Sequence, residues 1–529
     1  MICTRFLLPL VLAVVTVDVP RARAQADSTA RSVVGAGSSD AAVLARIRSE
    51  GLERSQVVET ATQLSDVRGP RLAGSPGYRK AAEWARQTLD SYGLRNASLE
   101  PWGKRRGRSW VVDRHSVELV KPYYERIVAY PKAWSPPTAG VVRGIPKLIA
   151  IRSDSDLVRH RAELKGAIVL NGTVARDTSL PKPFVRRFTD AELDSMSRIT
   201  DPGSPRTYWE DADGYMERVE RRRLLSVQLK AAGVAAVLEP SRNANAVGIS
   251  GYQAYDSDVT KAVPAFVVSS ADYARIANLV ERNQAPVLEL VLRSRYLPGD
   301  SLGFNIVAEL PGSDPDLAAE VVMVGGHFDS WTAGTGATDN AAGCAVAMEV
   351  MRILTVIGAR PKRTIRAVLW DGEEHEDYYG SMGYVRKHFG DPETMVVKPA
   401  QATVSAYFNI DNGTGRMRGI YTQGNAAVRP ILAGMLEPLR DLGASTLTIA
   451  NVGSTDHMPI SAIGIPAFTF IQDPLDYETR THHTNLDVAL NLAGEDLKQA
   501  AVVAASVVYQ TANRSERLPR LPLPLVRRK

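Results

Sequence analysis

Cysteine is almost absent from this sequence. The 529 residues include two cysteines, Cys3 and Cys344. Because Cys3 lies in a short N-terminal leader, described below, Cys344 has no partner with which to form a disulfide in the mature chain. A small disulfide-stabilised scaffold is therefore excluded, and core burial or metal must hold the fold together. Cys344 lies among small residues, where we expect it to pack, with no neighbouring feature that marks a nucleophile.

Long hydrophobic runs are also lacking. The apolar run Phe6–Val17 is too short to span a bilayer, and no later stretch approaches the necessary length. Arg5 precedes this run, and Ala22-Arg23-Ala24 follows it with the small-residue pattern of a cleavage site. We therefore expect residues 1–24 to be a cleaved signal peptide. The mature protein is then secreted or periplasmic, without stable membrane insertion.

A strongly basic body is the third feature that the sequence lacks. The formal net charge is +6, but the leader carries three arginines against Asp18, and the tail from Arg514 carries six basic residues against Glu516. The rest of the chain is therefore close to neutral. This argues against nucleic-acid binding through a basic face.

The chain is too long for one hydrophobic core, so we expect two or three domains. Dense proline and glycine punctuation with short apolar runs indicates a small β-rich module inserted into a larger domain. The predicted organisation has a flexible Ser/Ala/Gly-rich lead, two parts of the larger domain on either side of the insert, and a basic Pro-rich tail. The corresponding residues are 25–40 for the lead, 41–112 and 298–512 for the larger domain, 113–297 for the insert, and 513–529 for the tail.

Strand and helix patterns alternate from Gly303 onward. Apolar runs such as Val321–Gly325 and Thr364–Trp370 are separated by helical segments such as Ala341–Ile357. This alternation predicts an α/β fold with a mostly parallel sheet sandwiched by helices. Such folds place their functional sites beyond the carboxyl ends of the strands.

Histidines and carboxylates gather at four of these predicted strand ends. Several carboxylates converging on one sheet edge would repel one another without a counter-charge, and a bound cation supplies one. Histidine with aspartate or glutamate suits Zn²⁺. Each loop alone is compatible with a solvated acid or a helix cap, but the four together favour a metal site. The clustered residues are His327, Asp329, Asp339, Asp371, Glu373, Glu374, Asp411, His482, His483 and Asp487.

An ordered set of motifs carries a resemblance. GGHFDS, a helix-opening TDN, GEE after a strand, NID at a strand end and HHTNLD follow one another, and the loop GPRLAGSPG precedes them at Gly69–Gly77. The set resembles the di-zinc exopeptidase family that includes secreted bacterial aminopeptidases, carboxypeptidase Q and glutamate carboxypeptidase II. The resemblance runs from about residue 45 to 512. It implies a phosphorylase/hydrolase-like zinc peptidase core with a protease-associated domain as the insert.

The resemblance also implies roles for individual residues. Two zinc ions per chain are bridged by Asp339, with His327 and Asp411 completing one site and Glu374 and His483 the other. Glu373 is then the general base that takes a proton from the bridging water. Asp329 accepts a hydrogen bond from the imidazole of His327, and the Asp339–Asn340 peptide bond is cis.

Two loops depart from the family pattern. One extra residue follows the Glu373–Glu374 pair before the next Gly-Ser, and another lies within Gly453–Pro459. Both loops border the substrate cleft in the family. His482 is an alternative to His483 as a ligand, and we expect His457 to shape the pocket.

The expected substrate is a peptide or dipeptide, and the expected activity is that of an aminopeptidase. A carboxypeptidase Q-like dipeptidase or metallocarboxypeptidase is the alternative. Two further alternatives share the fold. One is a non-catalytic binding protein like the transferrin receptor, and the other is a transferase of the glutaminyl cyclase type. The complete ligand set disfavours both.

Overall fold

The computed structural model describes residues 34–105, 107–173, 184–203, 208–244, 246–249, 251, 261–298, 302–375 and 378–524. The predicted signal peptide lies outside these residues. The chain divides into two compact units after Ala42, and all elements below except the start of α1 belong to the unit from Val43 onward.

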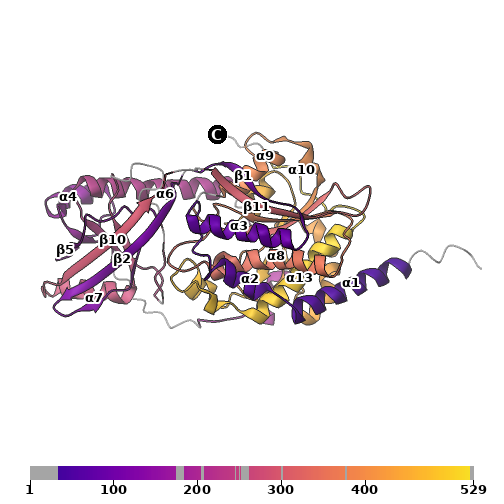
Figure 1. Cartoon of the computed structure of the whole chain (residues 1–529), viewed down its shortest axis with the longest axis horizontal. Coiled ribbons are helices and arrows are strands. Elements are labelled where there is room, and N and C mark those ends of the chain that lie inside the picture. Colours follow the sequence, from indigo (N-terminus) through magenta and orange to yellow (C-terminus); the bar gives the residue numbers. More distant parts are fainter. Residues whose placement is uncertain are drawn as a thin grey trace, which may run out of the picture. The chain divides into compact units, whose positions relative to one another are not determined.

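An eight-stranded sheet forms the centre of the larger domain (Figure 1). Its neighbours β13, β12, β16 and β19 run parallel, whereas the β1–β11, β11–β13 and β19–β17 pairs are antiparallel. The prediction of a mostly parallel sheet is therefore confirmed. In sheet order the strands are β1 (Arg95–Lys104), β11 (Leu302–Leu310), β13 (Thr364–Trp370), β12 (Val321–His327), β16 (Val404–Asn409), β19 (Ala467–Gln472), β17 (Met417–Tyr421) and β18 (Thr446–Thr448).

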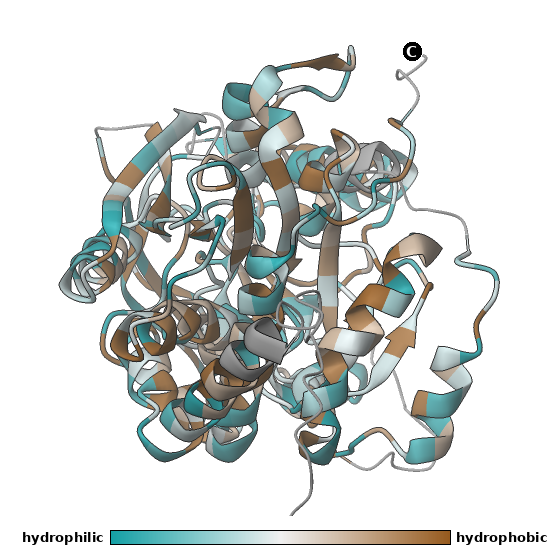
Figure 2. Cartoon of the chain, turned by 90° about the vertical axis from the view of Figure 1, so that its right-hand side faces the viewer, coloured by the Kyte–Doolittle hydropathy of each residue, from teal (hydrophilic) through white to brown (hydrophobic). Residues whose placement is uncertain are grey.

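Helices cover both faces of this sheet. On β12, Val322 and Val324 belong to one hydrophobic core, while Val321 and Met323 belong to a second core on the opposite face. This alternation follows from the two-residue period of a strand. Helices α2 (Val57–Leu64), α3 (Pro76–Ser91), α8 (Ala342–Val356) and α13 (Gly494–Asn513) pack on the first face, and α9 (Tyr379–His388) and α12 (His457–Ala462) on the second. Figure 2 shows brown, hydrophobic residues on the strands between these layers.

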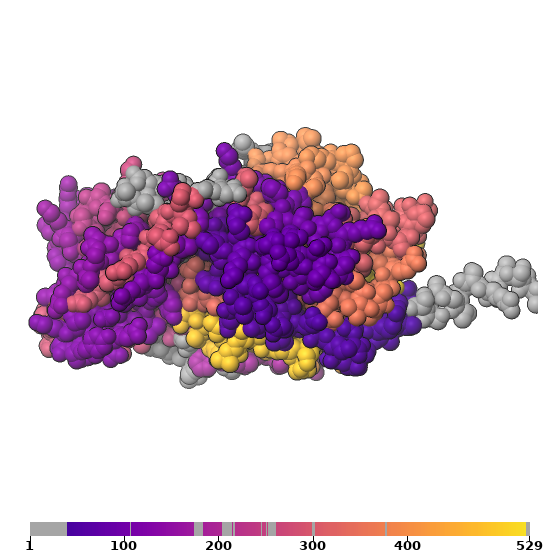
Figure 3. Space-filling view, in the orientation of Figure 1, coloured from indigo at the N-terminus to yellow at the C-terminus, as the bar shows by residue number. Residues whose placement is uncertain are grey.

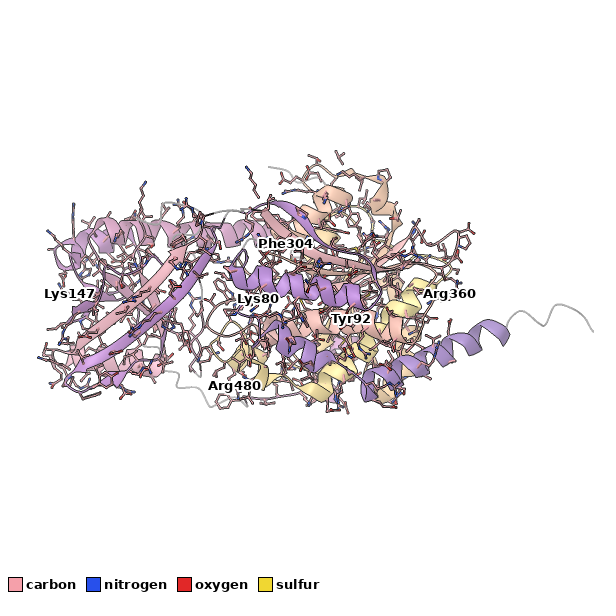
Figure 4. All side chains as sticks on the ribbon, viewed as in Figure 1. Lys80, Tyr92, Lys147, Phe304, Arg360 and Arg480 are labelled. Carbon is pink, nitrogen blue, oxygen red and sulfur yellow. The ribbon has the colours of Figure 1, made fainter. Side chains whose placement is uncertain are left out.

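The region of the predicted insert forms two small sheets at the left of Figure 1, and the same region covers the left of the space-filling view in Figure 3. The first has the order β3 (Glu125–Arg126), β2 (Trp110–Lys121), β10 (Val287–Tyr296) and β5 (Val142–Gly144). The second has the order β4 (Ala129–Pro131), β9 (Ala265–Val268), β8 (Ala236–Pro240), β7 (Ile168–Leu170) and β6 (Lys147–Leu148), with Lys147 labelled in Figure 4. Helices α4 (Asp154–Leu164), α6 (Tyr208–Ala231) and α7 (Ser270–Glu281) accompany these sheets, whereas α5 (Asp190–Ser197) contacts β18 of the large sheet. We call residues 110–296 the small-sheet region. The predicted boundary at 113 falls inside β2, and a protease-associated domain stays a prediction.

Other elements differ from the sequence-based expectations. Helix α1 (Val34–Glu53) begins within the stretch expected to be a flexible lead. The first part of the basic tail runs along the body, where Leu518 is buried and the guanidinium of Arg520 donates to the Gln401 carbonyl at 2.9 Å.

The remaining elements are β14 (Gly390–Asp391), β15 (Val396–Val397), α10 (Pro399–Thr403) and α11 (Arg429–Leu436). Within the described residues, no helix combines the length and the apolar character that crossing a membrane requires.

Candidate metal centre

Three parallel strands bring the acidic and imidazole side chains to one edge of the large sheet. His327 is the last residue of β12 and lies in register with Trp370, the last residue of β13. Glu373 and Glu374 follow β13, and Asp411 follows β16. A Cβ on Gly326 would lie 2.5 Å from the Ile410 carbonyl oxygen, so the glycine before His327 permits the close approach of these two loops.

Two groups of side chains meet on opposite oxygens of Asp339. The Nε2 of His327 lies 3.1 Å from Asp339 Oδ1 and 3.2 Å from Asp411 Oδ1. The Nε2 of His483 lies 3.2 Å from Asp339 Oδ2 and 2.8 Å from Glu374 Oε2. Tetrahedral zinc with bonds of about 2.0–2.1 Å separates its ligand atoms by roughly 3.3 Å. Three of the four distances are close to that edge length, and the His483–Glu374 distance of 2.8 Å is shorter.

The chemistry of these side chains fits two cations. Asp339 Oδ2 is buried and accepts no hydrogen bond of good geometry within the described residues. Beside Asp339, Glu374 and His483 lies a cavity of about 10 Å³, roughly the minimum that accommodates a single water-sized sphere. Burial opposes the charge of Asp339, but the imidazoles of His327 and His483 hold its pKa well below the ordinary value. Burial and the Asp339 charge together raise the pKa of Glu374 well above its usual range, and a bound cation would relieve this repulsion.

The backbone around Asp339 has the predicted conformation. The Asp339–Asn340 peptide bond is cis, as expected. The Asn340 side chain donates to the Ile410 carbonyl at 2.7 Å and accepts from the Gly343 amide at 2.9 Å, at the start of α8. One residue earlier, the Thr338 amide and hydroxyl both donate to Asp487 Oδ1, at 2.6 and 2.8 Å. The last residue of the HHTNLD motif therefore holds the turn that presents Asp339.

Asp329 has a different partner from the one expected. Its backbone carbonyl lies 3.1 Å from the Nδ1 of His327, whereas its carboxylate is 3.9 Å from that atom. The carboxylate instead accepts from the Glu373 amide at 3.1 Å, the Glu374 amide at 3.2 Å and the Nδ1 of His375 at 3.0 Å. These two backbone amides and the imidazole belong to the loop that follows β13. Because the carboxylate of Asp329 accepts from them, it points away from His327.

His483 is placed better than His482 to act as a ligand. The Nε2 of His482 lies 3.8 Å from Asp339 Oδ2, and its ring stacks on Tyr477 with centroids 4.6 Å apart. His483 reaches both Asp339 and Glu374 at shorter distances. The loop that carries both histidines also contains Arg480, labelled in Figure 4.

The two groups of side chains open into a cavity of about 720 Å³. Glu373 lines it together with His327, Asp339, Glu374, Asp411 and His483. Burial raises the pKa of Glu373 well above its ordinary value; His327 opposes the shift, while the carboxylates of Asp411 and Glu374 increase it. Among the described residues of the lining, Arg218 from α6 is the one lysine or arginine. The other lining residues include Tyr378, Asn412, Val452, Gly453, Ser454, Thr455, Tyr477, Glu478 and His482.

His457 supports this cavity from behind its wall. Its Nε2 donates to the Val452 carbonyl at 2.9 Å, and burial lowers its pKa to about 4, so it is neutral near pH 7. The neighbouring Asp456 is buried and accepts from the Ser381 hydroxyl at 2.5 Å. Burial raises the pKa of Asp456 to about 8. This acid was not among the predicted site residues.

Two further buried residues hold the strand end that carries His327. Cys344 Sγ lies 2.9 Å from the His327 carbonyl oxygen, and burial raises the pKa of the thiol to about 12, in keeping with a packing role. The Arg71 guanidinium donates to the carbonyls of Phe328 at 2.7 Å, Leu64 at 2.9 Å, Thr335 at 3.0 Å and Gly336 at 2.8 Å. Arg71 belongs to the GPRLAGSPG loop, but no local sequence signal marks it as buried.

Comparison with known proteins gives a match to one family profile and matches to individual proteins. Residues 305–508 match the profile of Peptidase family M28. Carboxypeptidase Q from Homo sapiens is 26% identical over 476 residues, which cover 89% of this chain and 88% of that protein. Aminopeptidase YwaD from Bacillus subtilis (strain 168) is 26% identical over 210 residues, which cover 37% of this chain and 42% of that protein.

Solved structures share the fold. A Peptidase M28 precursor from Shewanella amazonensis SB2B superposes with a TM-score of 0.67 at 23% identity, covering 92% of this chain and 99% of that chain. A zinc aminopeptidase from Bacillus subtilis superposes with a TM-score of 0.53 at 20% identity, covering 88% of this chain and 96% of that one. Both span the large sheet and the small-sheet region.

Proposed function

We propose that this chain, whose residues 305–508 match the profile of Peptidase family M28, is an exopeptidase that uses two zinc ions. The observation that carries the proposal is that one imidazole lies 3.1–3.2 Å from each oxygen of Asp339 and that each imidazole also lies 2.8–3.2 Å from one further carboxylate. His327 and Asp411 would hold one ion, and Glu374 and His483 the other. Asp339 would bridge them.

The residues of the chain then divide the chemical work. When bound, the two zinc ions supply a nucleophilic water of lowered pKa and polarise the scissile carbonyl. Glu373 lies in the cavity wall with a raised pKa. It takes the proton from the attacking water and delivers it to the leaving amine. Asp329 holds the backbone of Glu373 and Glu374 and thereby fixes where both carboxylates point.

Two substrate classes are candidates. Similarity to carboxypeptidase Q extends over nearly the whole chain, including the small-sheet region, and this favours short peptides with a free carboxyl end. Arg218, on α6 of that region, supplies the cavity with a cation for such a carboxylate. The aminopeptidase expectation remains the second candidate, which the partial similarity to Aminopeptidase YwaD favours. We also propose export of the protein, on the leader pattern of residues 1–24.

Blocked substrates separate the two candidates. The purified enzyme would be assayed on a dipeptide with free termini, on its N-acetyl and C-amide derivatives, and on an aminoacyl-nitroanilide. Loss of cleavage on amidation identifies the carboxypeptidase Q-like specificity. Retained cleavage of the amide and the nitroanilide, with no cleavage of the N-acetyl compound, identifies an aminopeptidase. No cleavage of any of the four by zinc-loaded protein would contradict the proposal.

Arg218→Met tests the source of carboxylate recognition. We expect its KM for the free dipeptide to rise about tenfold or more, because a charge-assisted bond contributes roughly 1.5–3 kcal/mol. Cleavage of the amide, which lacks the carboxylate, should stay as low as in the original protein. Arg221→Met, three residues later on the same helix, where the side chain is exposed and pairs with Glu217, is the matched control.

A further inference from the structure

His375 is a buried histidine that the proposed chemistry does not use. It is 1% exposed and directly follows Glu374. Its Nδ1 lies 3.0 Å from Asp329 Oδ2, and its Nε2 is buried without a hydrogen-bond partner in the described part of the chain. Because the Asp329 carboxylate is ionised and can only accept, the Nδ1 of His375 must donate.

Two tryptophans hold the ring of His375. Trp331, in the loop after β12, meets it edge-on with centroids 4.2 Å apart, and Trp134 meets it edge-on at 5.3 Å. Trp134 belongs to the small-sheet region, is fully buried, and donates from its Nε1 to the Arg108 carbonyl at 2.8 Å. Both tryptophans lie in one hydrophobic core with Leu72 and Trp110. The small-sheet region therefore packs directly against the loop of Glu373 and Glu374.

The Asp329 carboxylate connects this packing to the reacting groups. It accepts from His375 and from the amides of Glu373 and Glu374, so three consecutive residues are anchored on one side chain. A rotation of the His375 ring would remove one of the two donors to Asp329 Oδ2 and weaken the anchor of the loop that carries Glu373 and Glu374. Aromatic packing leaves little room for such rotation.

We propose that His375 is a positioning residue. Clamped by Trp134 and Trp331, it orients Asp329 and so couples the small-sheet region to the placement of Glu373 and Glu374. The proposal rests on the proposed two-zinc function. It adds a reason why the small-sheet region matters to turnover besides its contribution to the cavity.

Two substitutions of His375 distinguish its hydrogen bond to Asp329 from its packing between the two tryptophans. Asparagine places its amide nitrogen where Nδ1 lies, whereas phenylalanine fills the space between the tryptophans without a donor. For His375→Phe we expect kcat to fall roughly 10–100-fold and zinc affinity to weaken by a similar factor, with KM within about threefold. His375→Asn should keep kcat within about threefold of the original despite a lower melting temperature.

The measurements are steady-state kinetics, zinc affinity by chelator competition, and thermal melting of each variant. His388→Phe is the control, because His388, the last residue of α9, pairs with Glu100 of β1 and does not line the cavity. Losses of kcat that follow melting temperature, with the asparagine variant worse than the phenylalanine variant, would overturn the proposal. Unchanged kcat and zinc affinity in His375→Phe would do the same. If the unsubstituted protein binds no zinc in the chelator competition, that result would instead refute the proposed function.

A double-mutant cycle tests the connection to the small-sheet region. Trp134→Phe should lower kcat, and combined with His375→Phe it should lower kcat no further, because both act through Asp329. Multiplicative losses would show that Trp134 acts by another route. That result would remove the coupling from the proposal.

Discussion

Replacing Arg71 by methionine should destabilise the protein far more than a loop substitution normally does. The guanidinium is fully buried and faces no carboxylate directly, but it donates to the carbonyls of Leu64, Phe328, Thr335 and Gly336 at 2.7–3.0 Å. Methionine fills much of the same volume and donates nothing. Each buried carbonyl that loses its donor costs about 1–3 kcal/mol.

The sum over four carbonyls is about 4–12 kcal/mol, and two effects reduce it. Burying the charge of Arg71 costs free energy, as the lowering of its pKa by burial shows, and the methionine variant avoids this cost. Some carbonyls also gain water or relax. We therefore expect a loss of about 4 kcal/mol or more, and about 2–4 kcal/mol for Arg71→Lys, which keeps the charge but donates from a single nitrogen.

Urea unfolding of the zinc-free protein measures this loss, provided that the slope against urea is unchanged. Arg440→Met is the control, because that side chain is 65% exposed and pairs with Glu437, so about 0.5 kcal/mol or less should be lost. If Arg71→Met unfolds within about 1 kcal/mol of the control, the carbonyl contacts do not hold the strand end as described.

Three further predictions follow from the geometry. Glu373→Gln should keep both zinc ions and lose roughly 10²–10⁴-fold in kcat, whereas Glu374→Gln should also lose zinc; equal zinc loss in the two, measured by metal analysis, would show that their roles are reversed. His457 has a folded pKa of about 4, so the unfolded state binds its proton first, and stability should fall below pH 6.5 by up to about 3 kcal/mol at pH 4. The His457→Gln variant should lack this loss of stability. If the urea midpoints of the variant and the original protein fall equally as the pH is lowered, the prediction is wrong. Leu518→Ala should cost about 2–4 kcal/mol because Leu518 is 2% exposed; a loss under about 0.5 kcal/mol would mean that the tail is not packed on the body in solution.

The sequence predicted those parts of the fold that local periodicity determines. Thr364–Trp370 is a strand with the predicted limits, and the helix predicted at Ala341–Ile357 runs over Ala342–Val356, because each carries a regular apolar pattern. Strand β17 was missed, since Met417–Tyr421 is short and contains arginine and glycine. It is stabilised by its partners β19 and β18 and not by its own residues.

The candidate site was predictable where its side chains lie at strand ends, and not where they depend on long-range contacts. The convergence of His327, Asp339 and Glu374 follows from parallel strands. The partner of Asp329 does not, because His375 is 46 residues away and reaches it only through the loop that follows another strand. Arg71 is likewise buried by carbonyls from elements far along the chain, which no local pattern encodes.

The most direct test of the two-zinc account is titration of metal-free enzyme with zinc, with hydrolysis and bound metal measured together. The account predicts that chelation abolishes activity and that activity returns fully only as binding approaches two zinc ions per chain. Replacement of His327 and of His483 should each remove one ion. Full activity in protein that retains close to no zinc, or binding that saturates at one ion in the active enzyme, would contradict it.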